Sequence, residues 1–115
     1  MDIVLRNGTV VTAKDTYRAD VGIQGNLLTA IGQDLQGDQV LDVLGKYIFP
    51  GAVDPHTHLE LDAVSSDDFY TGTVAAACGG TTTIIDYAEQ TRGETLTQAV
   101  EAWRAKADPK VVIDY

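Results

Sequence analysis

The sequence is poor in cysteine and in basic residues, and each shortage excludes a class of protein. Its single cysteine, Cys78, excludes an intrachain disulfide and a metal site built from several cysteines. Only 8 lysines and arginines stand against 17 aspartates and glutamates, so the formal net charge is −9. A chain this acidic lacks the positive surface that attracts phosphate backbones or anionic lipids. We therefore expect neither a nucleic-acid nor a membrane partner.

Long apolar runs are also missing. No stretch reaches the roughly 18 apolar residues of a transmembrane helix, and Met1 to Arg6 lack the basic and apolar regions of a signal peptide. We therefore expect a cytoplasmic protein.

Cys78 stands between three alanines and two glycines, a setting that favours a small buried side chain over a reactive thiol.

The first fifty residues have the pattern of a β structure. Asn7-Gly8 and Gly25-Asn26 each separate two short apolar runs, and both are typical of two-residue hairpin turns because they tolerate positive φ. Two further strands are predicted at 40–43 and 47–49, on either side of Leu44-Gly45-Lys46. Together these segments predict a small sheet or half of a β-sandwich.

From Pro50 onward the pattern changes to alternating strands and helices. The elements predicted there are a strand at 52–54, a helix at 69–78, a buried strand at 81–86, a helix opened by the capping box of Thr95 and Gln98, and a strand from 111. The strands begin about thirty residues apart, which is the length of a βαβ unit and predicts a parallel sheet covered by helices. Three strands do not close a barrel, so we expect the N-terminal portion of a longer protein.

The two histidines, His56 and His58, lie two positions apart directly after the Pro50-Gly51 turn. If the segment that leads into Val53 is an extended strand, its two-residue period places both imidazoles on the same side. Two imidazoles at one strand end suit a zinc ion. The alternative is a pair of neighbouring surface histidines with no metal. We predict that His56 and His58 are metal ligands.

Two histidines do not complete a site, because a catalytic zinc takes three protein ligands and a water. Nearby carboxylates are candidates for further ligands: Asp54, Glu60, Asp62, Asp67, Asp68 and Asp86. Asp54 shares the face of His56 and is placed to orient an imidazole as an acceptor. Asp67 and Asp68 are better explained as charges at a helix N-terminus.

The segment 59–65, after the histidines, is longer than a minimal strand-to-helix connection, and long loops at such a position are usually functional. Its apolar residues Leu59, Leu61 and Val64 suit either packing in the core or lining of a substrate pocket. The sequence leaves both interpretations open.

The residues around the histidines resemble a known signature. The segment from Phe49 to Leu59 is similar to the P-G-x-x-D-x-H-x-H signature of the amidohydrolase superfamily. The segments 66–69, 71–73 and 75–86, and the opening strands at 4–11, resemble its hydantoinase/dihydropyrimidinase branch. The resemblance covers nearly the whole chain.

This resemblance implies an α/β fold, namely a metal-dependent (β/α)8 TIM barrel with an accessory β-sandwich domain. Residues 1–49 would form the N-terminal part of the sandwich, and residues 50–115 the first strands and helices of the barrel. It also implies two zinc ions per subunit, bridged by a carboxylated lysine and a hydroxide, with His56 and His58 on the more buried metal. The lysine, two further histidines and an aspartate base would lie beyond residue 115, so we expect no catalytic residue in this portion.

The implied activity is hydrolysis of the cyclic amide (C–N) bond in a hydantoin or dihydropyrimidine ring by a homotetramer. One alternative is an allantoinase-like hydrolase of cyclic ureides. The other is a non-catalytic scaffold related to dihydropyrimidinase that has lost its metal ligands, and the presence of His56 and His58 favours the enzyme. Leu59-Glu60-Leu61 departs from the arginine that dihydroorotases carry after H-x-H. We expect residues 1–115 alone to be inactive.

Overall fold

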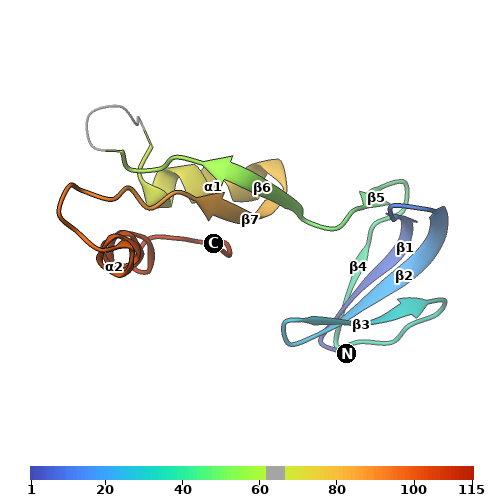
Figure 1. The fold of residues 1–115 in the computed structure, drawn as a ribbon. Helices are drawn as coiled ribbons and strands as arrows, with labels where there is room; N and C mark the ends of the chain where they lie inside the picture. The colour runs from blue at the N-terminus through green and yellow to red at the C-terminus, as the bar shows by residue number, and fades with distance from the viewer. Residues whose placement is uncertain (62–66) are drawn as a thin grey trace. The chain divides into compact units, whose positions relative to one another are not determined.

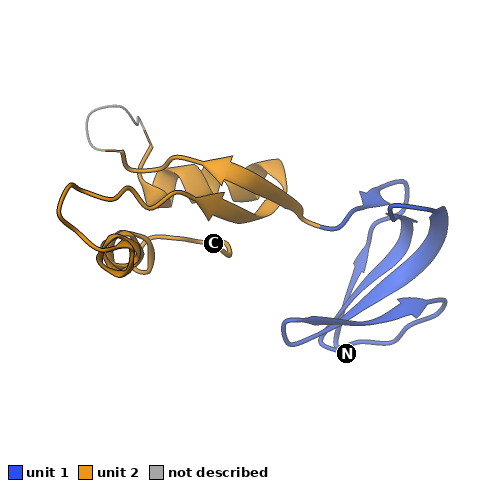
Figure 2. Ribbon diagram, in the orientation of Figure 1, with its two compact units in different colours: residues 1–50 blue, residues 51–115 orange. Residues whose placement is uncertain are grey.

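The computed structural model describes residues 1–61 and 67–115, which form two compact units, residues 1–50 and residues 51–115 (Figure 2). The elements of the first unit are β1 (Ile3–Val11), β2 (Thr16–Gln24), β3 (Leu27–Gly32), β4 (Gln39–Asp42) and β5 (Tyr47–Ile48) (Figure 1). Those of the second unit are β6 (Ala52–Thr57), α1 (Phe69–Gly79), β7 (Thr81–Asp86) and α2 (Leu96–Ala107). Neither helix is long and apolar enough to cross a membrane.

The first unit is a mixed sheet with β1 near its centre. β1 pairs antiparallel with β2, and β2 with β3, while β4 and β5 both pair with β1 in parallel. Val10, Ala19 and Val21 form the buried cluster of this sheet, and Leu5 and Ile48 pack against it. The turn predicted at Gly25-Asn26 is confirmed, because Gly25 has a φ of 58° between the paired ends of β2 and β3.

The hairpin predicted at Asn7-Gly8 is wrong. β1 runs through both residues with a shift in its register against β2, and Asn7 has a φ of 64°. A bulge forms there because the Asn7 N–H donates to the buried carboxylate of Asp20 at 2.9 Å. The chain reverses later instead, where the Thr12 N–H donates to the Asp15 carbonyl at 2.9 Å.

The second unit contains the parallel pair β6 and β7, with a helix after each strand. Contacts join α1 to β7 and to α2. The strand predicted from residue 111 is reduced to one parallel bridge between Thr83 and Asp114, whose backbone exchanges hydrogen bonds with Thr82 and Ile84. The prediction that β7 is buried holds for Ile84 only, since Ile85 on the opposite face is 52 % exposed.

Both helices begin where their capping residues predict. In α1 the Asp68 carboxylate accepts from the Thr71 N–H at 2.9 Å, and in α2 the Thr95 hydroxyl accepts from the Gln98 N–H at 3.2 Å. Gly80 ends α1 with a φ of 89°. In α2, Ala99 is buried whereas Leu96 and Val100 are exposed.

Cys78 is exposed, so its predicted burial is wrong. The buried residues of α1 are Phe69 and Thr73, four positions apart on one face. Cys78 follows Thr73 by five positions, which places it about 140° around the helix from that face. Small neighbours alone therefore did not indicate which side of the helix is covered.

Gly51, which precedes β6, gives a testable prediction about this unit. A Cβ at Gly51 would lie 2.0 Å from Oγ1 and 2.3 Å from Cγ2 of Thr82. Gly51→Ala should therefore lower the free energy of unfolding by about 1–3 kcal/mol, measured by denaturant titration. Gly79→Ala is the matched control, because no atom lies within 4 Å of the added methyl group. Equal stability of the two variants would contradict the close approach at Gly51.

Candidate metal centre

The two histidines meet at the end of β6. His56 lies within the strand and His58 one residue beyond its end, so β6 continues past the predicted limit at Asp54. The apolar segment before it does not form one strand, because β5 ends at Ile48 and β6 begins at Ala52. As the two-residue period predicts, the imidazoles lie on the same side, with their Nε2 atoms 2.9 Å apart.

A separation of 2.9 Å between ring nitrogens has two chemical explanations. The protonated Nε2 of one imidazole can donate a hydrogen bond to the other, or both unprotonated nitrogens can face one cation. Two metal–nitrogen bonds of about 2.0–2.1 Å can span this gap, so the donor atoms fit a shared zinc ion. Both side chains are exposed in this chain and therefore accessible to a cation.

Tyr87 is part of this site and was not predicted from the sequence. Its ring centroid lies 4.6 Å from that of His56 and 5.2 Å from that of His58, and its plane is stacked on His58 at 25°. Tyr87 directly follows β7, the parallel neighbour of β6, so the topology brings it to the same edge as the histidines. Its ring therefore packs against both imidazoles.

The carboxylates nearest to the histidines bind the backbone and neighbouring side chains. Asp54 Oδ1 accepts from the backbone N–H of His56 at 3.2 Å, so its bond reaches the main chain and not the ring that we expected it to orient. Asp86 accepts from the Thr57 hydroxyl at 2.8 Å, from the Leu59 N–H at 3.0 Å and from Trp103 Nε1 at 2.7 Å. Asp86 thus connects β7, the end of β6 and α2.

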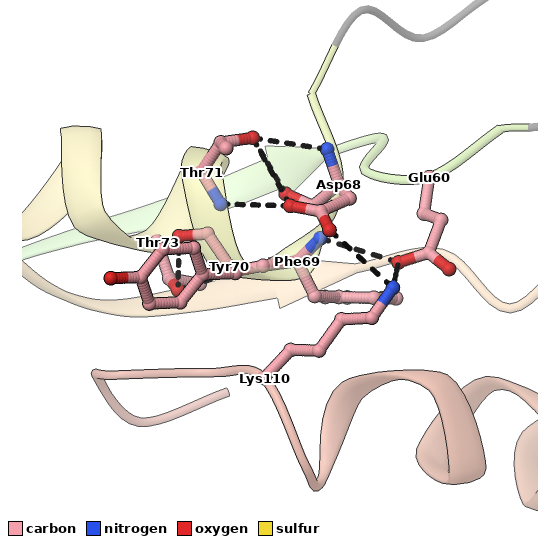
Figure 3. A network of polar contacts seen from close by, with 7 residues as sticks. All are labelled: Glu60, Asp68, Phe69, Tyr70, Thr71, Thr73 and Lys110. Atoms are coloured by element: carbon pink, nitrogen blue, oxygen red, sulfur yellow. Dashed lines mark hydrogen bonds and ion pairs between the residues drawn. The ribbon is translucent and has the colours of Figure 1, made fainter.

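Two further carboxylates, those of Glu60 and Asp68, lie close to the Lys110 ammonium at the start of α1 (Figure 3). Lys110 Nζ lies 2.7 Å from Glu60 Oε2 and 3.5 Å from Asp68 Oδ2. Glu60 also accepts from the Phe69 N–H at 3.4 Å, and its own N–H donates to the Asp67 carbonyl at 2.9 Å. Asp68 caps α1 as predicted, and Glu60 holds the start of the helix together with Lys110. Lys110 follows Glu60 by 50 residues, and no sequence signal linked them.

These contacts shift two pKa values, one down and one up, and each shift favours the charged form of its group. The hydrogen bond from the Thr71 N–H lowers the pKa of Asp68, and Lys110 lowers it further. The hydrogen bond to Glu60 raises the pKa of Lys110. We call Glu60, Asp68 and Lys110 the Lys110 cluster; in the folded state its contacts favour the charged forms of Asp68 and Lys110.

Some of the remaining residues that the sequence suggested for the site lie in the described part of the chain, and others lie outside it. A Cβ on Gly72 would lie 2.5 Å from Leu59 Cδ2, so Leu59 packs against α1. Leu61 is half-buried, and Asp62 and Val64 lie outside the described residues. Within residues 1–61 and 67–115, no three histidine, cysteine, aspartate or glutamate side chains gather as a metal site. The described part thus offers the His56–His58 pair, which supplies two donors.

Comparison with known proteins finds extensive similarity. No family model matches the chain. Over its whole length it is 50 % identical to a D-hydantoinase of Geobacillus stearothermophilus and 49 % identical to one of Ralstonia pickettii, and it covers 26 % of each. It is 42 % identical to a dihydropyrimidinase of Rattus norvegicus, over 98 % of this chain and 24 % of the relative. The chain therefore spans about a quarter of the length of the curated relatives it matches.

Solved structures agree with these similarities. A D-hydantoinase from Bacillus sp. AR9 matches with a TM-score of 0.92 at 50 % identity, over 99 % of this chain and 25 % of that one. A dihydropyrimidinase from Brevibacillus agri NCHU1002 matches with a TM-score of 0.94 at 52 % identity, over 100 % of this chain and 26 % of that one. The mixed α/β arrangement of the described residues is thus also found in these structures.

The Lys110 cluster gives a prediction about pH. Because the pKa of Asp68 is lowered in the folded state, its contribution is present above its unfolded pKa and is lost as the pH falls through the lowered value. Because the pKa of Lys110 is raised, its contribution is present below its unfolded pKa and is lost as the pH rises through the raised value. Lys110→Met should therefore lower the melting temperature most near neutral pH.

This difference between Lys110→Met and the wild type should shrink in acid and at high ionic strength, which calorimetry over a pH and salt series can measure. Lys14→Met, at an exposed lysine of the first unit, is the matched control and should change little. A Lys110→Met effect that is independent of both pH and salt would show that the side chain acts by packing and not by charge.

Proposed function

Since this chain is homologous over its full length to the N-terminal portion of hydantoinases and dihydropyrimidinases, we propose that its protein hydrolyses the cyclic amide bond of a hydantoin or dihydropyrimidine ring. The observation that carries the proposal is the convergence of His56 and His58, whose Nε2 atoms lie 2.9 Å apart at the end of β6. The names of the relatives favour this activity over allantoinase-like chemistry. The presence of both histidines favours an enzyme over a scaffold.

We propose further that the fold of the whole protein is a (β/α)8 barrel with an accessory β-sandwich. Residues 1–49 would belong to the sandwich and residues 50–115 to the barrel. The parallel pairing of β6 with β7, and the helix that follows each strand, support the assignment of the second part. In a barrel of this kind, the carboxyl ends of the strands carry the active site, and the histidines lie at such an end. We expect the whole protein to assemble as a homotetramer and to be located in the cytoplasm.

His56 and His58 would hold a zinc ion through their Nε2 atoms. When bound, zinc lowers the pKa of a water and polarises a carbonyl group, the two tasks that amide hydrolysis needs near neutral pH. The histidines would bind zinc as neutral imidazoles, with the Tyr87 ring packed against both, and the hydrogen bond from Thr57 to Asp86 holds the end of β6. A second zinc ion, a bridging carboxylated lysine and the remaining ligands would come from residues outside these 115 positions.

The test uses the complete protein with either histidine replaced. His56→Ala and His58→Ala should each reduce bound zinc and abolish ring opening of hydantoin and dihydrouracil, because each removes a metal ligand. Zinc is measured by mass spectrometry of the purified protein, and ring opening by absorbance. After zinc removal by a chelator, the variants and the wild type should melt at similar temperatures. Full zinc content and near wild-type rates in either variant would contradict the proposal.

A further inference from the structure

Asp86 makes polar contacts on both sides of His58. Its Oδ1 atom accepts a hydrogen bond from the Thr57 hydroxyl at 2.8 Å and another from the Leu59 N–H at 3.0 Å. Thr57 and Leu59 are the residues immediately before and after His58. A single carboxylate oxygen thus binds the side chain of the residue before His58 and the backbone N–H of the residue after it.

The strand pairing alone does not fix His58. β6 ends at Thr57, and the register of β6 against β7 is irregular between Asp54 and Thr57. Pro55 lies within that interval and has no N–H with which to continue the ladder. Asp86 therefore provides side-chain hydrogen bonds at Thr57, the last paired residue of β6, and at Leu59 just beyond the strand.

The second oxygen of Asp86 is held by α2. Trp103 Nε1 donates to Asp86 Oδ2 at 2.7 Å, and the Lys106 ammonium lies 4.4 Å from the centroid of the Trp103 ring. The indole N–H and the Leu59 N–H can only donate, so the residue between them must accept from both sides. An asparagine at position 86 would turn its own NH2 group toward one of these donors. The site therefore requires a carboxylate.

We propose that Asp86 is a positioning residue that fixes His58 for metal binding, with Trp103 fixing Asp86 in turn. The inference rests on the proposed function, because it needs His58 to be a metal ligand. It differs from the interpretation of Asp86 as a ligand itself, since both of its carboxylate oxygens already accept hydrogen bonds, from Thr57 and Leu59 on one side and from Trp103 on the other. It also differs from a role in stability alone, which would leave the affinity for zinc unchanged in the folded protein.

The experiment measures zinc affinity of the complete protein by competition with a chromophoric chelator, below the melting temperature of each variant. Asp86→Asn should weaken zinc binding by about 10–100-fold, the usual effect of losing a group that orients a ligand. Thr57→Val, which removes the hydroxyl at nearly constant volume, and Trp103→Phe should weaken it in the same direction by less. Thr57→Ser keeps the hydroxyl and should bind zinc like the wild type.

A second measurement, the visible absorption spectrum of the cobalt(II)-substituted protein, reports ligand geometry directly. It should change in Thr57→Val and not in Thr57→Ser. If Asp86→Asn fails to fold, Thr57→Val and Thr57→Ser still test the positioning role of Asp86. Zinc affinity and cobalt spectrum unchanged in Thr57→Val and Trp103→Phe would overturn the inference, even if Asp86→Asn loses zinc.

His58→Ala separates failure of this inference from failure of the proposed function. If His58→Ala loses zinc while the variants at Thr57 and Trp103 bind it normally, only the positioning role is wrong. If His58→Ala binds zinc like the wild type, the ligand assignment is wrong and the inference falls with it.

Discussion

The parallel pairing of β6 with β7 is the contact on which the candidate site depends. It places the end of β6, which carries the histidines, beside the end of β7, which carries Asp86 and Tyr87. Tyr87 packs against both imidazoles, and Asp86 binds the backbone around His58. Neither strand alone would bring these groups together.

Carboxylates explain how this acidic chain holds its irregular backbone. In the first unit, Asp20 is buried and accepts from the N–H groups of Asn7 and Leu35 at 2.9 and 3.2 Å. In the second unit, Asp68 caps α1 and Asp86 bridges the end of β6. Each carboxylate satisfies N–H groups that the regular ladders and helices leave without a partner, and an unpaired buried N–H is costly.

Local chemistry explains what the sequence predicted correctly. Backbone geometry within a few residues determines the turn at Gly25-Asn26, the place of Asp68 at the start of α1, the capping box of α2 and the common side of His56 and His58. The errors arose where distant residues decide the outcome. Asn7-Gly8 forms a bulge because Asp20 binds it from the next strand. The roles of Asp86 and Tyr87 depend on strand pairing, which the pattern of one strand does not reveal.

We propose that His56 and His58 hold one metal ion together. Anomalous X-ray scattering from crystals of the complete protein grown with zinc, recorded on both sides of the zinc absorption edge, tests it most directly. We expect a zinc peak about 2.0–2.1 Å from the Nε2 atoms of both histidines. Zinc bound elsewhere in the protein, with the two imidazoles sharing only a proton, would contradict it.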